Sequence, residues 1–562
     1  MLFKAVKITM QVSLFGTIVG AIVSILSVAF VFGVKEISIL REAVSSCSLT
    51  ILGICFSVSP LIFLLISALL IIIVKRTMNI SRYHGPADVI LSAHSPNEKL
   101  DPKTGFLSTF SAFVSASGGA SVGQYGPLVH LGGTIGSLIN FRSSNLLTKD
   151  TFIGCGVAAA ISAGFNSPIG GIIFAHEAIL RHFSFKAIAP IAVSSVVSAT
   201  LTNKFFPSGI LFQSATTGIS MLPSVSLSLI LGPVCAIIAV MFMRSLLFLQ
   251  RESARFSENE IIRIIFAAIS VGLIGGLVPE VLGLGGTTIS EILDNKFSVQ
   301  FLIIILLLKL LVTVICLGMG FFGGVYSPAL VLGAAIGGAF TYFGNFLGIT
   351  NIGDTLIFAA MAALSASVIG APIASIVIIF ELTHSYDLAF VAIICVAGSC
   401  LISSLMFGHS FFDKQLINRD FKISRGRTDI LLSEYNVSSL LGKNSFLQFY
   451  VGSTRADVLK MFKENPDHTE AYLVDSKNTL KGKVKVNNLL NNLSNNFVTN
   501  KTPLFLKETD TISTAISKAS NFIGESIPVV TEEGVLIGVI TEADLFSEYL
   551  EVQDKISEIE RD

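Results

Sequence analysis

The fold of this chain is decided by a glycine-rich stretch, Gly118 to Gly133, which reads GGASVGQYGPLVHLGG. A second stretch, Gly318 to Gly338, reads GMGFFGGVYSPALVLGAAIGG. The spacing of Gly123, Tyr125 and Pro127 in the first stretch recurs in the second. In both, an apolar segment that still contains glycine follows the proline. We therefore expect the two stretches to form the same local structure.

Each stretch is predicted to be an unwound segment that opens into a helix with its N-terminus inside a membrane. Proline suits the first helical turn, because its missing N–H would have no partner there. Glycines before the proline let the backbone approach a ligand closely. The free N–H groups of a helix N-terminus attract an anion, and transporters aim such half-helices at a buried anion from two repeats.

The composition is that of an integral membrane protein. Of its 562 residues, 52% are hydrophobic and 14% are charged, and the mean hydropathy is +0.75. A soluble protein carries about 25% charged residues. The net charge of zero predicts no nucleic-acid partner. The seven cysteines form no CxxC pair, and HExxH and Walker motifs are missing, so we expect no metal site and no enzyme activity.

Apolar runs long enough to span a membrane recur along the first 407 residues. The first, Val12 to Val34, follows Lys4 and Lys7, which favours a cytoplasmic N-terminus. Further spans are predicted at about 49–74, 186–206, 221–249, 262–283, 300–318 and 387–407. Segments broken by Gly and Pro lie between them, and we expect these to form the interior: 105–142, 151–180, 318–348 and 354–382.

A second pair of repeated segments supports an internal duplication. Ala158 to Glu177 reads AAAISAGFNSPIGGIIFAHE, and Ala362 to Glu381 reads AALSASVIGAPIASIVIIFE. Pro168 pairs with Pro372, and the two terminal glutamates pair with each other. The element order is therefore repeated in two halves. Such symmetry is typical of transporter folds, in which the binding site lies near the interface between the repeats.

After Leu405 the composition becomes that of a soluble protein. A strand is predicted from Ile527 to Val530, a second strand from Leu536 to Ile540, and a helix from Glu542. An earlier copy of this α/β unit surrounds Gly482. We expect four regions: a membrane domain at 1–420, a linker at 421–435, and two small units at 436–494 and 495–562.

These motifs, together with the spacing Lys309-xxx-Thr313-xxxx-Gly318, resemble the CLC family of chloride channels and proton-coupled anion exchangers. The terminal pair resembles tandem CBS domains, the first of them degenerate. The resemblance implies a polytopic α-helical membrane protein with two internally repeated halves and broken helices, followed by a small cytoplasmic α/β CBS-domain pair. It also implies a homodimer in a lipid bilayer, with one anion pathway in each subunit. We expect a plasma membrane, the inner membrane of a bacterium.

The resemblance also implies which residues bind the anion, largely through backbone N–H groups at helix N-termini: Gly85, Pro86, Gly126, Val325, Tyr326 and Phe412. Phe412 falls where the family often has a tyrosine whose hydroxyl contacts the central anion. Proline at position 86 tends to accompany nitrate in the family, whereas serine accompanies chloride. The alternative for Pro86 is that it only begins a helix.

Two departures from the family pattern concern proton transfer. The gating glutamate of the family falls at Tyr125, and the inner proton-transfer glutamate falls at Ala178, next to Glu177. A phenol has an ordinary pKa near 10, so it stays neutral while it blocks a pathway or donates one hydrogen bond. Alanine carries no proton. We therefore predict an anion channel or uncoupled anion transporter, for chloride, with Tyr125 as the gate.

Two other functions stay open at this point. One is a proton-coupled chloride or nitrate exchanger with unconventional carriers such as Glu177 or His176. The other is a nucleotide-sensing membrane regulator with a vestigial pore. Lys309 lies in an apolar run and is either functional or a structural anchor.

The second CBS copy offers half of a nucleotide site. Thr541 and Asp544 match positions that bind the phosphate and ribose of adenine nucleotides, whereas the first copy has Lys485 and Asn488 there. Adenine nucleotide is therefore the one cofactor we consider. The alternative is a structural CBS pair that supports the dimer.

Overall fold

The computed structural model describes residues 2–44, 48–51, 54–80, 82–95, 98–140, 147–205, 220–349, 352–419, 421, 432, 435–442, 444–491, 502–520 and 522–561. The chain divides into two compact units, 1–421 and 422–562. Most of the predicted linker at 421–435 and the predicted boundary between 494 and 495 lie outside the described residues.

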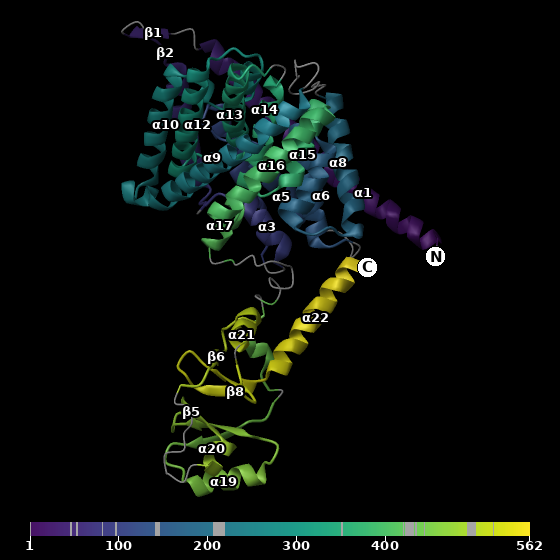
Figure 1. Ribbon diagram of the computed structural model, residues 1–562, viewed down its shortest axis with the longest axis vertical. Coiled ribbons are helices and arrows are strands. Elements are labelled where there is room, and N and C mark those ends of the chain that lie inside the picture. Colours follow the sequence, from purple (N-terminus) through teal and green to yellow (C-terminus); the bar gives the residue numbers. More distant parts are fainter. Residues whose placement is uncertain are drawn as a thin grey trace. The chain divides into compact units, whose positions relative to one another are not determined.

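The first unit is built almost entirely of helices (Figure 1). They are α1 (Leu2–Val44), α2 (Ser59–Thr77), α3 (Pro86–His94), α4 (Pro102–Ser117), α5 (Tyr125–Asn140), α6 (Lys149–Phe165), α7 (Pro168–Phe174), the π-helical turn η1 (Ala175–Leu180), α8 (Phe185–Phe205), α9 (Met221–Phe256), α10 (Glu260–Leu277), the 3-10 turn η2 (Pro279–Val281), α11 (Gly286–Leu293), α12 (Val299–Met319), α13 (Tyr326–Phe346), α14 (Gly353–Ile369), α15 (Pro372–Thr383), α16 (Tyr386–Phe407) and α17 (Phe411–Ile417).

Seven described segments are long and apolar enough to cross a membrane. They include α9, α10, α12 and α16, at the places where the sequence predicts spans. One prediction was wrong in detail, because the run at 49–74 does not form one helix. Its first residues belong to an antiparallel hairpin of β1 (Ser48–Ile51) and β2 (Ile54–Ser57), and α2 begins only at Ser59. Pro60 stands in the first turn of α2, the position that proline favours.

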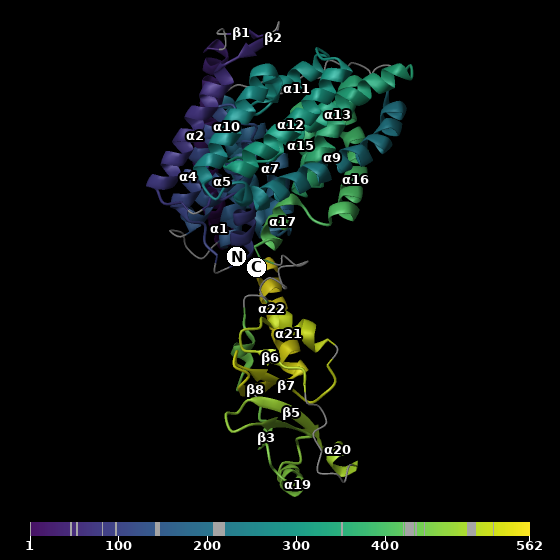
Figure 2. The same cartoon turned by 90° about the vertical axis from the view of Figure 1, so that its left-hand side faces the viewer.

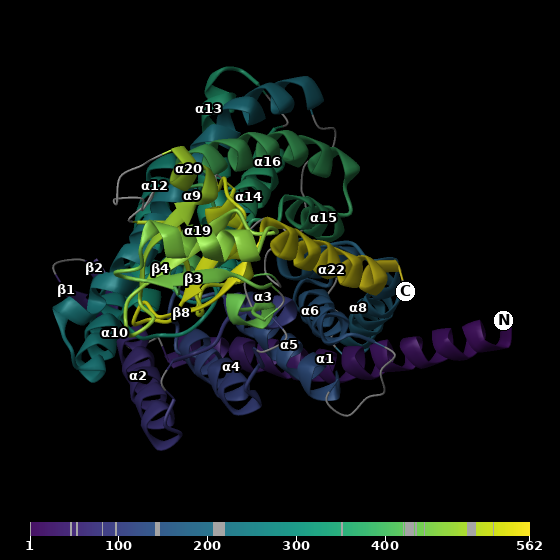
Figure 3. The same ribbon diagram turned by 90° about the horizontal axis from the view of Figure 1, so that it is seen from below.

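The helices with broken sequence lie inside, as predicted. Helices α6 and α14 are apolar around their whole circumference, and nearly all of their residues are buried. Glycines bring the central backbones together: a Cβ on Gly156 of α6 would lie 1.9 Å from the carbonyl oxygen of Gly132 of α5. Helices α13 and α14 meet in the same way at Gly333 and Ala360. Helix α1 covers α6 and α8 (Figure 3), and α2 lies beside α4 and α10 (Figure 2).

Two sets of reciprocal contacts relate the halves: a backbone bridge between Gly123 and Gly324, and carboxylates that each half supplies as caps to a helix of the other. Gly123 and Gly324 form an antiparallel bridge in which each N–H donates to the other's carbonyl, at N···O distances of 2.6 and 2.7 Å. The series α4 to α8 therefore corresponds to the series α12 to α16, with α5 matching α13 and α7 matching α15. Reciprocal bonds between equivalent residues require a local two-fold relation at this point. The predicted duplication is confirmed.

The second unit contains two copies of one α/β arrangement (Figure 2). The first comprises β3 (Leu447–Tyr450), α19 (Arg455–Glu464), β4 (Glu470–Val474), β5 (Leu480–Lys485) and α20 (Val486–Asn491). The second comprises β6 (Leu506–Lys507), α21 (Ile512–Ala519), β7 (Ile527–Val530), β8 (Leu536–Ile540) and α22 (Glu542–Arg561). In each copy the first two strands are parallel and the last two antiparallel. The predicted strands at 527–530 and 536–540 and the helix from Glu542 are confirmed.

Candidate functional site

Three helix N-termini of the first unit meet at one place. They belong to α3, α5 and α13, and each follows or contains a glycine that allows close backbone approach. A Cβ on Gly126 would lie 3.1 Å from Cα of Gly324 and 3.5 Å from Cγ of Pro86. A Cβ on Gly123 would lie 2.9 Å from the carbonyl oxygen of Gly324. The N–H groups of these helix ends therefore converge, which favours an anion there.

A cavity of about 90 Å³, called here the inner cavity, lies on one side of this junction. Its lining combines backbone at the helix starts with aromatic side chains of α17 and the loop before α13. It includes Gly85, Pro86, Pro127, Gly324, Val325, Phe411 and Phe412. Four of the predicted anion-binding residues thus share one cavity, and Gly126 touches its wall at Pro86.

The charge at the mouth of the inner cavity is set by Asp88 and two arginines. The Asp88 carboxylate accepts the Gly85 N–H at 2.8 Å and so caps α3. It also pairs with Arg82 at 2.6 Å and with Arg419, just after α17, at 3.0 Å. One carboxylate against two guanidinium groups leaves a positive balance, so Asp88 does not repel anions from this mouth.

A larger cavity of about 630 Å³, the outer cavity, lies beside Tyr125. Three buried polar atoms among its lining residues have no hydrogen-bond partner in the described part of the chain: Nη1 of Arg41, Oε1 of Gln124 and Oγ of Ser327. The Arg41 guanidinium and the Ser327 hydroxyl can donate to an anion in this space. The lining also includes Lys35 and Lys296 against Glu42 and Glu291, and Glu42 lies 4.0 Å from Arg41, so the outer cavity offers an anion these donors with a small positive balance.

An aromatic cluster surrounds Tyr125 and consists of Tyr125, Phe165 and Tyr326. The Tyr125 ring is stacked on Phe165, with centroids 3.5 Å apart and planes 7° apart. Tyr326 stands edge-on to both rings, at centroid distances of 5.5 Å from Tyr125 and 5.0 Å from Phe165. Tyr326 was predicted to bind the anion through its backbone N–H group. Its side chain is part of this aromatic cluster.

Local backbone structure positions the aromatic cluster. Helix α6 ends at Phe165, because the next residue, Asn166, has φ 53° and leaves the helical conformation. Gly164 leaves room for the Tyr125 ring, because a Cβ there would lie 2.9 Å from the ring atom Cε1. The Tyr125 hydroxyl donates a long hydrogen bond, 3.4 Å, to the Gly164 carbonyl. The ring is held more by stacking than by this bond.

Lys309 is a structural anchor for the wall of the outer cavity. Its fully buried ammonium group donates to the carbonyls of Val281 at 3.0 Å and Gly283 at 2.9 Å. Gly283 and the following residues line the outer cavity. The lysine thus ties α12 to the loop before α11 and satisfies carbonyls that no helix would satisfy.

Glu177 and Glu381 cap helices of opposite halves. The Glu177 carboxylate accepts N–H groups of Ile373 at 3.0 Å and Ala374 at 2.7 Å, at the start of α15. Glu381 accepts those of Ile169 at 3.0 Å and Gly170 at 2.8 Å, at the start of α7. This symmetry indicates that Glu177 is a structural residue. Negative charge at these helix starts is stabilising.

The other candidate proton residues lie close to Glu177 in the chain. Ala178 is buried in the π-helical turn. His176 donates through its Nδ1–H to the carbonyl of His182 at 2.8 Å, and its ring stacks on Phe183 at 5.0 Å. Both imidazole contacts are made within the segment that follows α7.

In the second unit, Thr541 and Asp544 contact each other at the start of α22. The Asp544 carboxylate accepts the Thr541 N–H at 2.8 Å and the Thr541 hydroxyl at 2.7 Å, and the Asn444 amide also donates to it. The pair therefore caps a helix, and a nucleotide would have to share the Asp544 oxygens with these donors.

Sequence reasoning missed two residues of the site, Phe165 and Arg41. Phe165 stands in the repeated segment just before Pro168, but nothing in the sequence indicates that its ring stacks on Tyr125. Arg41 lies beyond the end of the first apolar run, after Lys35 and Glu36. Basic residues beyond the end of such a run are expected on orientation grounds alone.

Comparison with known proteins agrees with this architecture. A family model described as voltage gated chloride channel matches residues 63–404, and one described as CBS domain matches 497–551. The H(+)/Cl(-) exchange transporter ClcA of Vibrio campbellii is 28% identical over 326 residues, which are 56% of this chain and 69% of that protein.

Two solved structures share the fold. A slow cyanobacterial Cl-/H+ antiporter has a TM-score of 0.65 at 19% identity, and the match covers 74% of this chain and 99% of that one. A eukaryotic CLC transporter has a TM-score of 0.63 at 17% identity, and the match covers 95% and 98%.

Proposed function

Because this chain belongs to the voltage gated chloride channel family and carries CBS domains at its C-terminal end, we propose that it moves chloride passively across a membrane. In this proposal it is a channel or an uncoupled transporter, and the Tyr125 ring is its gate. The anion passes from the outer cavity through the junction of α3, α5 and α13 to the inner cavity.

The observation that carries the proposal is the place of Tyr125. Its side chain lines the outer cavity, while the next residues of α5, Gly126 and Pro127, contact or line the inner cavity. The ring therefore lies between the two spaces, in the aromatic cluster. A neutral phenol there obstructs an anion without exchanging a proton for it.

The polar groups of the two cavities support passage of an anion. On the outer side, Arg41 and Ser327 offer donors that the described chain does not use. On the inner side, the starts of α3 and α13 and the arginines around Asp88 supply positive potential. Such fixed dipoles replace part of the hydration that an anion loses.

The surroundings of Ala178 favour passive transport over exchange. Alanine has no titratable group, and the neighbouring Glu177 is occupied as the cap of α15. His176 is directed to His182 and Phe183. Proton transfer by the route that the CLC family resemblance implies would need a proton carrier at both position 125 and position 178, which here are Tyr125 and Ala178.

A second candidate function is proton-coupled exchange of chloride or nitrate. It is favoured by the relatives, since the named curated protein and one of the two solved structures are exchangers of Cl- and H+. Pro86, which begins α3 and lines the inner cavity, is the residue that would favour nitrate.

We propose further that the protein is a homodimer. Helices α7 and α15 lie side by side and expose Ile169 and Ile373 at equivalent positions after their prolines. These helices and their neighbours α8 and α16 offer an apolar face for a second copy.

We place the N-terminus and the CBS domains in the cytoplasm of a bacterium, with the membrane domain in its inner membrane. Adenine nucleotide at Thr541 and Asp544 also stays a proposal, tested by ATP titration of Asp544→Ala.

The proposed transport is tested with purified protein in liposomes under an outward chloride gradient, while chloride and protons are recorded together. Chloride efflux that requires valinomycin and potassium as an electrical shunt, without proton movement, is the expected result. Proton uptake at a fixed ratio to chloride would favour the exchanger instead. Repeating the assay with nitrate tests Pro86, because Pro86→Ser should then lower the nitrate flux relative to chloride.

A further inference from the structure

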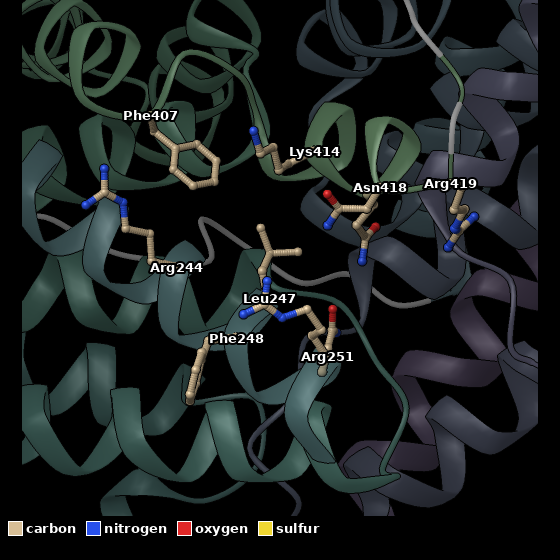
Figure 4. Close-up of a pocket in the computed structure, with 10 residues that line it drawn as sticks. Arg244, Leu247, Phe248, Arg251, Phe407, Lys414, Asn418 and Arg419 are labelled. Carbon is tan, nitrogen blue, oxygen red and sulfur yellow. The ribbon is translucent and has the colours of Figure 1, made fainter. Parts of the chain in front are cut away.

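A basic pocket of about 750 Å³ lies between the C-terminal part of α9 and the segment from the end of α16 through α17. Figure 4 shows Arg244, Arg251, Lys414 and Arg419 around this pocket, with Phe248 and Phe407 among them. No aspartate or glutamate is among the described residues that line it. The pocket is thus a concave, cationic site with aromatic walls. The transport proposed above gives it no role.

Two of the four cations lack an acidic partner in the described part of the chain. The Arg244 guanidinium donates to the carbonyl of Met406 at 2.7 Å, which fixes it without neutralising it. The Lys414 ammonium lies 5.9 Å from the centroid of the Phe407 ring, a cation–π contact. By contrast, Arg251 pairs with Glu252 and Arg419 pairs with Asp88. The uncompensated charge therefore lies on both sides of Phe407.

The exposed side chains place this pocket at a membrane boundary. In the last turns of α9 the exposed Phe248 (59%) and Phe256 (53%) alternate with Arg251 and Arg255, whereas the exposed residues before them are mostly apolar. Along α16, Leu405 is 77% exposed just before the helix ends at Phe407. Exposed apolar residues that give way to arginine and lysine mark the level of lipid headgroups. Basic pockets between helices at this level suit anionic headgroups.

We propose that this pocket binds the phosphate headgroup of an anionic membrane lipid. Arg244 and Lys414 contact the phosphate. Lys414 stands on α17, two residues after Phe412 of the inner cavity, and Gln250, Gln415 and Arg419 line both spaces. A bound headgroup would therefore place negative charge next to the inner cavity and restrain α17.

The experiment uses native mass spectrometry of the full-length protein in a non-ionic detergent. The probes are dioctanoyl phosphatidic acid, dioctanoyl phosphatidylcholine and inorganic phosphate. Phosphatidic acid should bind at least tenfold more tightly than phosphatidylcholine. Each uncompensated cation should contribute about fivefold, so Arg244→Gln with Lys414→Gln should weaken binding roughly 25-fold. Arg255→Gln is the matched control, because Arg255 lies on α9 outside the pocket lining and is 83% exposed.

Lys414→Gln alone guards against misfolding, since this side chain makes no ion pair with any residue that the structure describes, and it should weaken binding about fivefold. Equal binding of phosphatidic acid to Lys414→Gln and Arg255→Gln would refute the proposal that the lipid binds in this pocket. Inorganic phosphate that binds as tightly as phosphatidic acid would overturn the lipid in favour of a free anion. The measurement requires no transport, so it stands apart from the test of the gate.

Discussion

Replacing Tyr125 by alanine is the sharpest test of the proposed gate. The substitution removes a ring that is stacked on Phe165 and meets Tyr326 edge-on. Aromatic pairs contribute about 0.5–1.5 kcal/mol each beyond their buried area, so the two pairs hold the ring with about 1–3 kcal/mol. If withdrawing the ring limits the flux, its removal should speed chloride efflux about 5- to 150-fold, because about 1.4 kcal/mol corresponds to a factor of ten.

Two further variants separate the ring from its hydroxyl. Tyr125→Phe keeps the stacked ring and loses only the 3.4 Å hydrogen bond to Gly164, so its efflux should stay close to that of the unaltered protein. Phe165→Ala keeps the tyrosine and removes its stacking partner, so its efflux should lie between the two. Efflux is measured with a chloride electrode after valinomycin is added to liposomes with equal protein content.

The refuting result is a folded Tyr125→Ala protein that releases chloride no faster than Tyr125→Phe. Folding is judged by a single symmetric peak in size-exclusion chromatography. In that event the barrier would lie elsewhere, and the junction of Gly123 with Gly324 would be the next place to examine.

Further predictions concern protons and stability. Tyr125→Glu alone should not produce chloride-driven proton uptake, because Ala178 still lacks a carrier; strong uptake, recorded with a pH electrode, would point to another inner relay. Chloride efflux of the unaltered protein should change less than twofold between pH 5.5 and 7.5, because a phenol with an ordinary pKa near 10 stays protonated throughout. Glu177→Gln should lower the thermal midpoint in detergent, at a cost of about 1–3 kcal/mol, because charged acceptors stabilise the N–H groups of α15; a normal midpoint with altered proton flux would contradict its structural role. Lys309→Met should destabilise the protein by at least about 2 kcal/mol, because two buried carbonyls lose their donor; an unchanged midpoint would count against the anchor.

The helix starts of the site could be predicted from local sequence. Proline in the first turn after glycine determines where α3, α5 and α13 begin, and this depends on neighbouring residues only. The duplication could be predicted from the same local signal, because Pro168 and Pro372 begin matching helical segments. Local rules thus located most of the proposed anion-binding residues in one cavity.

The rest depends on contacts between distant segments. The stacking of Phe165 on Tyr125 requires α5 and α6 to pack at one particular depth, which glycine spacing alone does not reveal. Likewise Arg419 reaches Asp88 from the far end of the membrane domain. The hairpin at 48–57 was missed because a short apolar run fits a strand as well as a helix.

The exchange of caps between Glu177 and Glu381 has a consequence for how the chain is made. When the first half leaves the ribosome, the start of α7 has no carboxylate and Gly123 has no bridge partner, because both arrive with the second half. Contacts so distant in sequence form slowly. The first half should therefore wait in the membrane as an incomplete bundle, the kind of intermediate that is open to degradation. Neither half expressed by itself should be stable, whereas the two expressed together as separate polypeptides should assemble. Because of the duplication, each half supplies contacts that the other half needs to complete its folding.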